Sequence, residues 1–326
     1  MCTKRPLVAG DVIYAERPFI ALPVKFYLTS APPSGLTLEG FTQHAWKERE
    51  ELLKEMIALL PPERQAAYRA LANSHTHDGS GPLAGVFRTN GFGLGLDTWR
   101  EIIPDIDDRD NRADHETTIS GVCDTLSRIN HSCCPNADVY FDMPSFSFVL
   151  SAVRDIPAGT DVTVGYCDLT DPAAARQKDL TPYGFTCTCV ACVSPNSSDP
   201  RRATIAASFP DPKFVVRMWL MNVVLPDDYV IQDSQRMIRL IEEEGLQSAW
   251  CYTLHFAVLA MAYAALGQRE NYLQARERVS ALGRACNPVE GHQLMVSLPE
   301  FRNSRSSGGC GCPTMDGGGL PSSMRK

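Results

Sequence analysis

Three cysteines, Cys187, Cys189 and Cys192, have the types and spacing that point most directly to chemistry, because they form a C-x-C-x-x-C cluster. Thiolates on such a tight turn can reach one ion at a zinc–sulfur distance of about 2.3 Å, and a tetrahedral site then needs a fourth ligand. Cys133 in the segment RINHSCCPN is the candidate, and the adjacent Cys134 is its competitor. A redox pair is one alternative, although a redox C-x-x-C usually opens a helix after a strand in a βαβ unit. Buried thiols without a metal are the other alternative.

Length and composition place this cluster in a folded intracellular protein. The chain has 326 residues, of which 44% are hydrophobic, and this is enough for about two domains with cores of their own. No apolar run reaches the roughly 18 to 20 residues of a bilayer crossing, and no apolar signal region follows the N-terminus. We therefore expect a cytoplasmic or nuclear protein that does not bind membranes. The formal net charge of -7 argues against direct nucleic-acid binding and is compatible with a basic protein partner.

The other cysteines carry no predicted function, since cysteines of an intracellular chain stay reduced. Five of them lie in or beside apolar stretches, and we expect small buried side chains at Cys2, Cys123, Cys167, Cys251 and Cys286. Cys310 and Cys312 lie in a glycine-rich tail for which we expect disorder. A short C-x-C in such a tail more often binds nothing.

Apolar periodicity predicts the elements that must position the cysteines. Residues 11–23 favour a strand followed by an extended segment, and residues 46–60 and 63–73 have the apolar spacing of two helices with a two-proline break between them. Glycine dominates residues 78–95, which predicts loop and turn around a short apolar segment. Residues 105–116 hold six carboxylates and predict a solvated loop.

The segments that flank RINHSCCPN alternate between short elements. A helix is predicted near residues 118–128, and a β-hairpin is predicted from residues 137–142 and 146–153. A third short strand is expected at residues 161–166 after a proline-glycine turn. Residues 194–202 have the composition of a linker.

From residue 213 onward the sequence predicts a helical domain. Apolar residues recur at helical spacing in four segments, which indicates at least four antiparallel helices. Gly245, Gly267 and Gly283 stand where C-caps would end these helices. One stretch, AMAYAALGQRENYLQA, looks like a single tetratricopeptide-type hairpin, which by itself does not indicate a repeat array.

The order of these motifs resembles a known family. RINHSCCPN, the hairpin, DIPAGTDVTVGY and LTPYGFTCTCVAC together resemble the second half of a SET domain with its post-SET zinc knuckle. Upstream, RPLVAGDVIYAERPFIALP resembles the first SET segment, and RTNGFGL resembles the Asn-x-Phe segment. The most similar architecture is the SET-and-MYND type, although this sequence has no MYND finger. The resemblance covers residues 3–193 and is only architectural for residues 200–301.

The resemblance implies an α+β fold. Small β-sheets of the SET type would be split by a helical insert and followed by the zinc knuckle and an all-α domain similar to tetratricopeptide repeats. We expect the first SET segment at 1–40, the insert and Asn-x-Phe segment at 41–115, the SET core at 116–186, the knuckle at 187–196, the helical domain at 200–301 and a disordered tail at 302–326.

The resemblance also implies an activity, the transfer of a methyl group from S-adenosyl-L-methionine to a lysine of a protein or peptide substrate by a monomeric enzyme. Tyr166 and Tyr183 match the family's catalytic positions. The matching cofactor contacts are Asn90, Asn130, His131, Tyr166 and Phe185. The matching ligands of one structural Zn²⁺ are Cys133, Cys187, Cys189 and Cys192.

The chemistry of these residue types agrees with that activity. A lysine must lose a proton from a pKa near 10.4 before its nitrogen can attack, and a narrow apolar channel disfavours the ammonium form. Aromatic ring faces tolerate the methylated cation that forms. Displacement at a sulfonium methyl is in line, so the protein supplies mainly alignment. Core packing of the aromatic residues, and a turn at Asn130 and His131, are the plainer alternatives.

One part of the family pattern lies outside this sequence. The family begins with a Gly-x-Gly turn that binds the methionine end of the cofactor, whereas the match here begins at about Thr3. A truncated N-terminus and an incomplete cofactor pocket are both compatible with this. The alternatives to an active enzyme are a catalytically silent interaction module derived from a SET domain and a plain zinc-binding scaffold.

Overall fold

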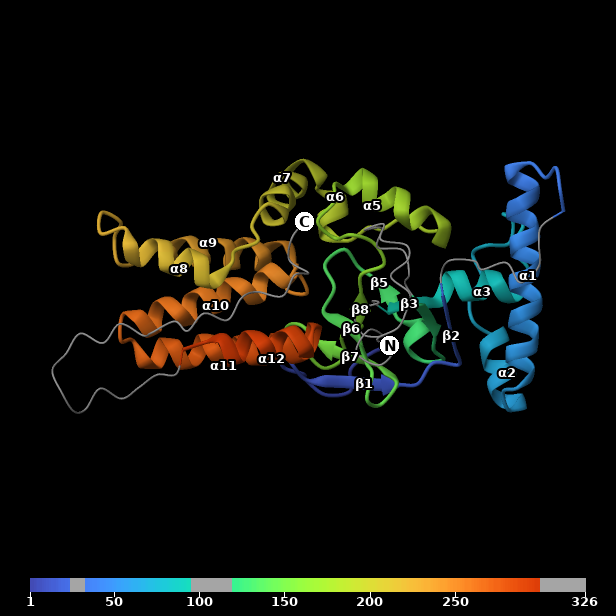
Figure 1. The fold of residues 1–326 in the computed structure, drawn as a ribbon, viewed down its shortest axis with the longest axis horizontal. Coiled ribbons are helices and arrows are strands. Elements are labelled where there is room, and N and C mark those ends of the chain that lie inside the picture. The colour runs from blue at the N-terminus through green and yellow to red at the C-terminus, as the bar shows by residue number, and fades with distance from the viewer. Residues whose placement is uncertain (24–32, 95–118, 300–326) are drawn as a thin grey trace.

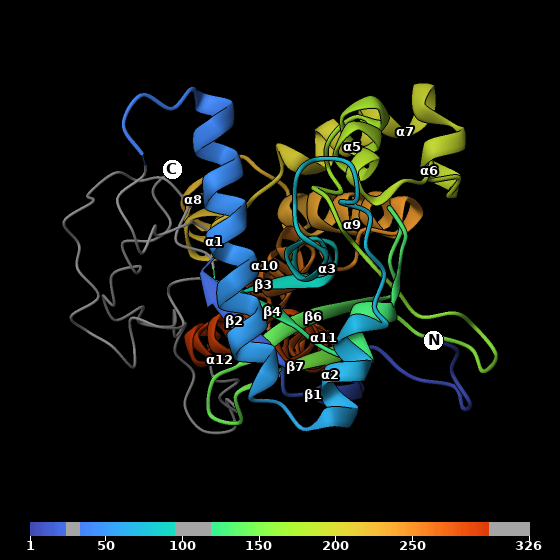
Figure 2. The same cartoon turned by 90° about the vertical axis from the view of Figure 1, so that its right-hand side faces the viewer.

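The computed structural model describes residues 1–23, 33–94 and 119–299, and its middle is formed by small β-sheets. Figure 1 shows α1, α2 and α3 at one end of the molecule and α8 to α12 at the other, with the strands between them. Figure 2, turned by 90°, shows α1 in front of the sheets and the C-terminal helices behind them. This mixed arrangement confirms the predicted α+β class. The acidic run at 105–116 and the tail at 302–326 fall outside the described residues.

The first sheet has the strand order β1-β7-β6 and is antiparallel throughout. It joins β1 (Val12–Glu16) to the two strands of a hairpin, β6 (Ala137–Asp142) and β7 (Ser147–Ala152). β7 is buried along its whole length, because it is the central strand and α11 packs against the hairpin. The hairpin prediction is confirmed.

Two smaller sheets complete the strand region. The first of them is antiparallel, with the order β2 (Ile20–Pro23), β4 (Ile119–Val122) and β3 (Gly91–Leu94). The second is a parallel pair of β5 (Asn130–His131) and β8 (Thr163–Val164). This parallel pair brings the NHSCC segment beside the end of the strand predicted at 161–166.

The helical insert contains the predicted helix pair and a third helix. Its helices are α1 (Leu38–Ala58), α2 (Pro62–Arg69) and α3 (Pro82–Asn90). The prediction of loop and turn at residues 78–95 is therefore wrong where α3 forms. The carboxylate of Glu50 on α1 accepts the N–H groups of Leu83 and Ala84 at 2.8–3.1 Å and so caps α3. Local glycine content cannot reveal this helix, because its cap comes from a residue 33 positions upstream.

The helix predicted near 118–128 is also wrong. This segment forms β4 and then the short 3-10 turn η1 (Leu126–Arg128). The carboxylate of Glu16 holds the start of that turn by accepting the N–H groups of Asp124, Thr125 and Leu126 at 2.8–3.2 Å. Because β4 fills the place between β2 and β3, long-range pairing overrides the local helical spacing.

The C-terminal half is helical, and the helices predicted from residue 213 onward are confirmed. Its elements are α5 (Ala173–Leu180), η2 (Thr181–Tyr183), α6 (Val190–Val193), α7 (Pro195–Ala206), α8 (Pro212–Met221), α9 (Tyr229–Glu244), α10 (Trp250–Ala265), α11 (Arg269–Cys286) and α12 (Pro288–Ser297). α10 is buried along most of its length between α8, α9 and α11. None of the helices in residues 1–23, 33–94 and 119–299 combines the length and apolar content of a membrane span.

Two of the three predicted C-cap glycines are confirmed. Gly245 and Gly267 follow α9 and α10 with left-handed φ angles of 66° and 71°. Gly283 is not a cap, because α11 continues past it to Cys286. A Cβ atom at Gly283 would lie only 2.8 Å from Cα of Gly291 in α12. The absent side chain therefore lets α11 and α12 approach closely.

The linker predicted at 194–202 is wrong, because these residues form most of α7. Ser198 and Arg202 on this helix are 1% and 0% exposed. Arg202 donates from Nε to the carboxylate of Glu244 on α9 at 3.0 Å and from Nη2 to the carbonyl oxygen of Cys133 at 3.0 Å. The C-terminal helices are thus anchored to the cysteine segment by buried contacts.

Candidate active site and metal centre

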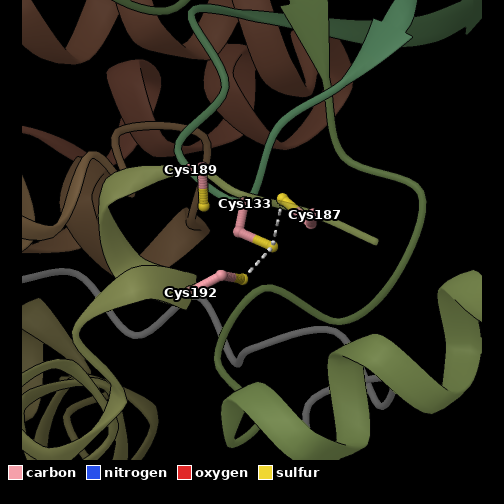
Figure 3. A group of neighbouring side chains, drawn as sticks. All are labelled: Cys133, Cys187, Cys189 and Cys192. Atoms are coloured by element: carbon pink, nitrogen blue, oxygen red, sulfur yellow. Dashed lines mark hydrogen bonds between the residues drawn. The ribbon is translucent and has the colours of Figure 1, made fainter. Parts of the chain in front are cut away.

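Four cysteine side chains from two segments meet beside α6. Cys133 lies between β5 and β6, Cys187 and Cys189 lie on the turn that enters α6 (Val190–Val193), and Cys192 lies within that helix (Figure 3). Sγ of Cys133 lies 3.8 Å from that of Cys187 and 3.5 Å from that of Cys192, and all four sulfur atoms lie within 4.8 Å of one another. The structure brings together the four cysteines that the sequence singled out.

The spacing of these sulfur atoms fits a zinc ion. Four ligands at about 2.3 Å from a tetrahedral ion lie about 3.8 Å apart. Two of the sulfur separations, 3.5 and 3.8 Å, are close to that value. A set of four thiolates is also a ligand type that zinc prefers. This cluster can therefore hold one zinc ion.

The neighbouring thiol of Cys134 lies outside this group of mutually close sulfurs. Its Sγ accepts from Nη2 of Arg202 at 3.4 Å, and its carbonyl oxygen accepts from Nη2 of Arg154 at 2.9 Å. It also contacts the thiol of Cys189. The geometry favours Cys133 over Cys134 as the fourth ligand, because Cys133 is close to Cys187 and Cys192 at once.

Four aromatic rings form a second cluster directly beside the cysteines. The ring centroid of Tyr166 lies 5.3 Å from that of His131 and 4.9 Å from that of Tyr183. The ring of Phe185 lies 6.0 Å from that of His131 and 6.5 Å from that of Tyr183. The parallel pairing of β5 with β8 brings the Tyr166 segment to His131. The structure thus gathers four residues that were predicted separately.

The positions of Tyr183 and Phe185 are fixed by the backbone conformation of Gly184 and by the side-chain amide of Gln177. Gly184 between them has a φ of 75°, a left-handed conformation that favours glycine. The side-chain amide of Gln177 on α5 donates to the carbonyl oxygen of Phe185 and accepts the N–H of Cys187, both at 3.0 Å. A single side chain therefore fixes the aromatic segment and the first knuckle cysteine together.

His131 connects the ring cluster to the sulfur cluster. Its Nδ1 accepts the backbone N–H of Tyr166 at 3.0 Å, so the neutral ring carries its proton on Nε2. Nε2 lies 3.2 Å from Sγ of Cys133 and donates to it. Burial lowers the pKa of His131 to about 4, although the Cys189 thiol acts in the opposite direction. His131, Cys133 and Cys167 also form a possible ligand group, but a protonated Nε2 offers an ion no lone pair.

The tyrosine hydroxyls of the cluster are neutral groups. Tyr166 donates to the carbonyl oxygen of Ile129, the residue directly before Asn130. Burial raises the pKa of Tyr166 to about 12, and the neighbouring hydroxyl of Tyr183 acts in the same direction. Burial also raises the pKa of Tyr183. Both hydroxyls can therefore orient a substrate group, but neither is a phenolate base at physiological pH.

The two asparagines predicted as cofactor contacts lie in different surroundings. Asn130 is exposed on β5. Asn90 is only 7% exposed, and its Nδ2 donates to the carbonyl oxygens of Ala72 and Val86. The Ser127 hydroxyl donates to the carbonyl oxygen of Asn90 at 2.8 Å. Asn90 therefore lies beside the turn that leads into Asn130, whereas its described contacts do not reach the rings.

The structure corrects the prediction that five scattered cysteines are buried. Cys123 and Cys251 are buried, Cys167 and Cys286 are partly exposed, and Cys2 is exposed. Two buried arginines near the sulfur atoms, Arg176 and Arg202, were not predicted at all. The only sequence signal for Cys167 is its position next to Tyr166, and a lone arginine in a helical pattern gives no signal.

A model of the SET domain family matches residues 1–167, just over half of the chain. The histone-lysine N-methyltransferase SMYD3 of Mus musculus is 27% identical over 47% of this chain and 29% of its own length. The histone-lysine N-methyltransferase set5 of Schizosaccharomyces pombe is 29% identical over 59% of this chain and 46% of its own length. The N-lysine methyltransferase SMYD2-A of Xenopus laevis is 37% identical over 26% of this chain and 20% of its own length.

The chain spans less than half the length of each of these relatives. The family model covers the part of the chain that holds the RINHSCCPN segment and Tyr166. The family predicted from the NHSC and C-x-C-x-x-C segments is therefore confirmed, and the chain belongs to the SET domain family.

Proposed function

We propose that this chain transfers a methyl group from S-adenosylmethionine to a lysine side chain of a protein and holds one structural zinc ion. The observation that carries the proposal is the joined pair of clusters, in which the ring of His131 contacts the rings of Tyr166 and Phe185 and its Nε2 bonds to Cys133. The relatives named as lysine methyltransferases support the same activity.

The cofactor is assigned to the side of the ring cluster that Asn130 and Phe185 form, with His131, Tyr166 and Asn90 as further contacts. Asn130 is exposed and offers both a donor and an acceptor. Phe185 is 37% exposed, so part of its ring is available to pack on the cofactor. S-adenosylmethionine bound there would supply a methyl group activated by the adjacent sulfonium.

The lysine is assigned to Tyr166 and Tyr183. Their partly buried rings disfavour an ammonium group, so the lysine can lose its proton before it attacks. The Tyr166 hydroxyl is held by the Ile129 carbonyl, which fixes its oxygen where it can align the amine and make weak C–H contacts with the methyl group. Alignment of this kind is the main contribution that an in-line displacement needs.

The zinc ion is assigned to Cys133, Cys187, Cys189 and Cys192. Four protein ligands leave no open position, so its role would be structural. It would hold the turn at 187–196, as a post-SET knuckle, against the NHSCC segment and with it the rings of Tyr183 and Phe185. The C-terminal helices would form the domain similar to tetratricopeptide repeats, and the packing of α11 on β6 and β7 supports their contact with the SET core.

Calorimetric titration of the zinc-loaded chain with S-adenosylmethionine tests this assignment. We expect saturable binding, and we expect Asn130→Ala to weaken it about 10-fold or more, or about 1.4 kcal/mol. Asn271→Ala is the matched control, because Asn271 is an exposed asparagine on α11. Parental affinity in the Asn130 variant would remove this residue from the cofactor site, and equal loss in both variants would show that the effect is not local.

A further inference from the structure

Arg176 on α5 is one of the largest side chains that the fold buries completely, with 0% exposure. Its Nη2 lies 3.6 Å from Sγ of Cys192, and its Nη1 donates to the carbonyl oxygen of Asp171. Its Nε has no hydrogen-bond partner among the residues that the structure describes. A guanidinium in this position is costly unless nearby anions compensate its charge.

The carboxylate near Arg176 is a weak counter-ion. Oδ1 of Asp199 lies 3.7 Å from Nη1, and its side chain is 27% exposed. The same oxygen also accepts the N–H of Ala173 at 3.0 Å. Sγ of Cys192, 3.6 Å from Nη2, is therefore as close to the guanidinium as this carboxylate oxygen.

We propose that Arg176 is a positioning residue of the metal centre, whose guanidinium hydrogen-bonds the zinc-bound thiolate of Cys192, offsets the negative charge of the cluster and thereby slows zinc release. This inference rests on the zinc site proposed above. Four thiolates and one Zn²⁺ leave two negative charges in excess, and partly buried charge of this kind requires compensation. Donors around metal ligands commonly tune metal affinity in this way.

The other two donors near the cluster differ from Arg176 in their partner or in their charge. Arg202 is paired with the Glu244 carboxylate at 3.0 Å, and its contact with Cys133 is to the carbonyl oxygen. His131 donates to Cys133 as a neutral ring. Of these three donors, Arg176 is the cation that contacts the sulfur of a proposed ligand, with Nη2 3.6 Å from Sγ of Cys192, so its removal should change the charge at the metal most.

The rate at which the chain releases zinc measures this role of Arg176. The zinc-loaded parent, R176Q and R176K are mixed with an excess of a chromogenic chelator, and the release rate is followed by absorbance. We expect R176Q to release zinc about 10- to 100-fold faster than the parent. Loss of a hydrogen-bond donor to a metal ligand typically weakens metal affinity by this factor. R176K keeps the charge but loses the forked donor, so its rate should be intermediate. K178Q, an exposed change on the same helix, should leave the rate unchanged.

A cobalt spectrum separates this role from a purely structural one. With Co²⁺ saturating the site, loss of an N–H···S bond should shift the sulfur-to-cobalt charge-transfer band of R176Q to lower energy. If Arg176 only supported the fold, its replacement would leave the energy of this band unchanged. The inference is overturned if R176Q keeps the parental release rate, or if its cobalt band does not move. If R176Q does not fold, R176K carries the same two measurements. A parent that binds no zinc would instead refute the zinc site itself.

Discussion

Replacing Arg202 with methionine should destabilise the whole chain, because this side chain ties the C-terminal helices to the NHSCC segment. The arginine is 0% exposed and donates to Glu244, Ser198 and the carbonyl oxygens of Cys133 and Leu169. Methionine keeps an unbranched stem and removes every one of these donors. The substitution therefore isolates the polar contacts from the packing.

The cost follows from the carboxylate that the substitution leaves behind. Glu244 is 3% exposed, and without Arg202 it would keep only Ser198 and Arg201 among its described donors. Removal of one partner of a buried ion pair costs about 3–5 kcal/mol. We expect a loss in this range, because the carbonyl oxygen of Cys133 also loses a donor while Arg201 retains part of the charge compensation.

Urea unfolding of the zinc-saturated chain, followed by circular dichroism, gives this free energy. Arg201→Met is the control, since Arg201 is 41% exposed and its pair with Glu244 should contribute about 1 kcal/mol or less. The double variant Arg202→Met/Glu244→Leu should recover part of the loss, because no unpaired carboxylate remains. A loss below about 1 kcal/mol for Arg202→Met, or a double variant no better than the single one, would refute the reasoning.

Four further predictions concern other parts of the molecule. Cys133→Ser should abolish zinc binding measured by elemental analysis, whereas Cys134→Ser should retain it; full zinc content in the Cys133 variant would contradict the ligand set. Gly283→Ala should lower the free energy of unfolding by about 1–3 kcal/mol, because a Cβ there meets Gly291, and an unchanged urea midpoint would show that α11 and α12 can separate freely. Burial lowers the pKa of His255 to about 4, so the unfolded chain takes up a proton first as the pH falls from about 6.5. Protonation linked to His255 should thus lower the free energy of unfolding by about 2 kcal/mol at about pH 5. In His255→Gln this free energy should fall less steeply as the pH drops, and the remaining fall should include the contribution of His131, whose pKa is also lowered by burial. Tyr166→Phe should cut methyl transfer about 10-fold or more at unchanged cofactor affinity and cost about 1 kcal/mol of stability, since the Ile129 carbonyl loses its donor; equal turnover in the variant would remove the hydroxyl from the mechanism.

Elements with strong local signals were predicted correctly from the sequence. The hairpin of β6 and β7, the helices α1 and α2, and the C-terminal helices follow from apolar spacing, which depends on a few neighbouring residues. The gathering of the four cysteines was predicted for a similar reason, because three of them lie within six residues of chain. Gly245 and Gly267 were correct because a left-handed cap is a local requirement.

The remaining errors arise where distant residues decide the structure. α3 depends on the Glu50 cap, β4 on its place between two strands, and α7 on the buried pair of Arg202 with Glu244. The need for glycine at position 283 follows only from its contact with Gly291 on the next helix. The same limit applies to the site, because the sequence named its residues but could not show that His131 bonds to Cys133 or that Arg176 faces the thiols.

The measurement that tests the central claim most directly is mass spectrometry of methyl transfer. The zinc-loaded chain, alone and with a Gly-x-Gly segment added upstream of Met1, is incubated with S-adenosylmethionine and a panel of core histones and other lysine-rich proteins. The account predicts methylation of a lysine that is lost when that lysine is replaced by arginine and when Tyr166 is replaced by phenylalanine. Absence of transfer by both forms of the chain, with zinc bound and the fold intact, would contradict it.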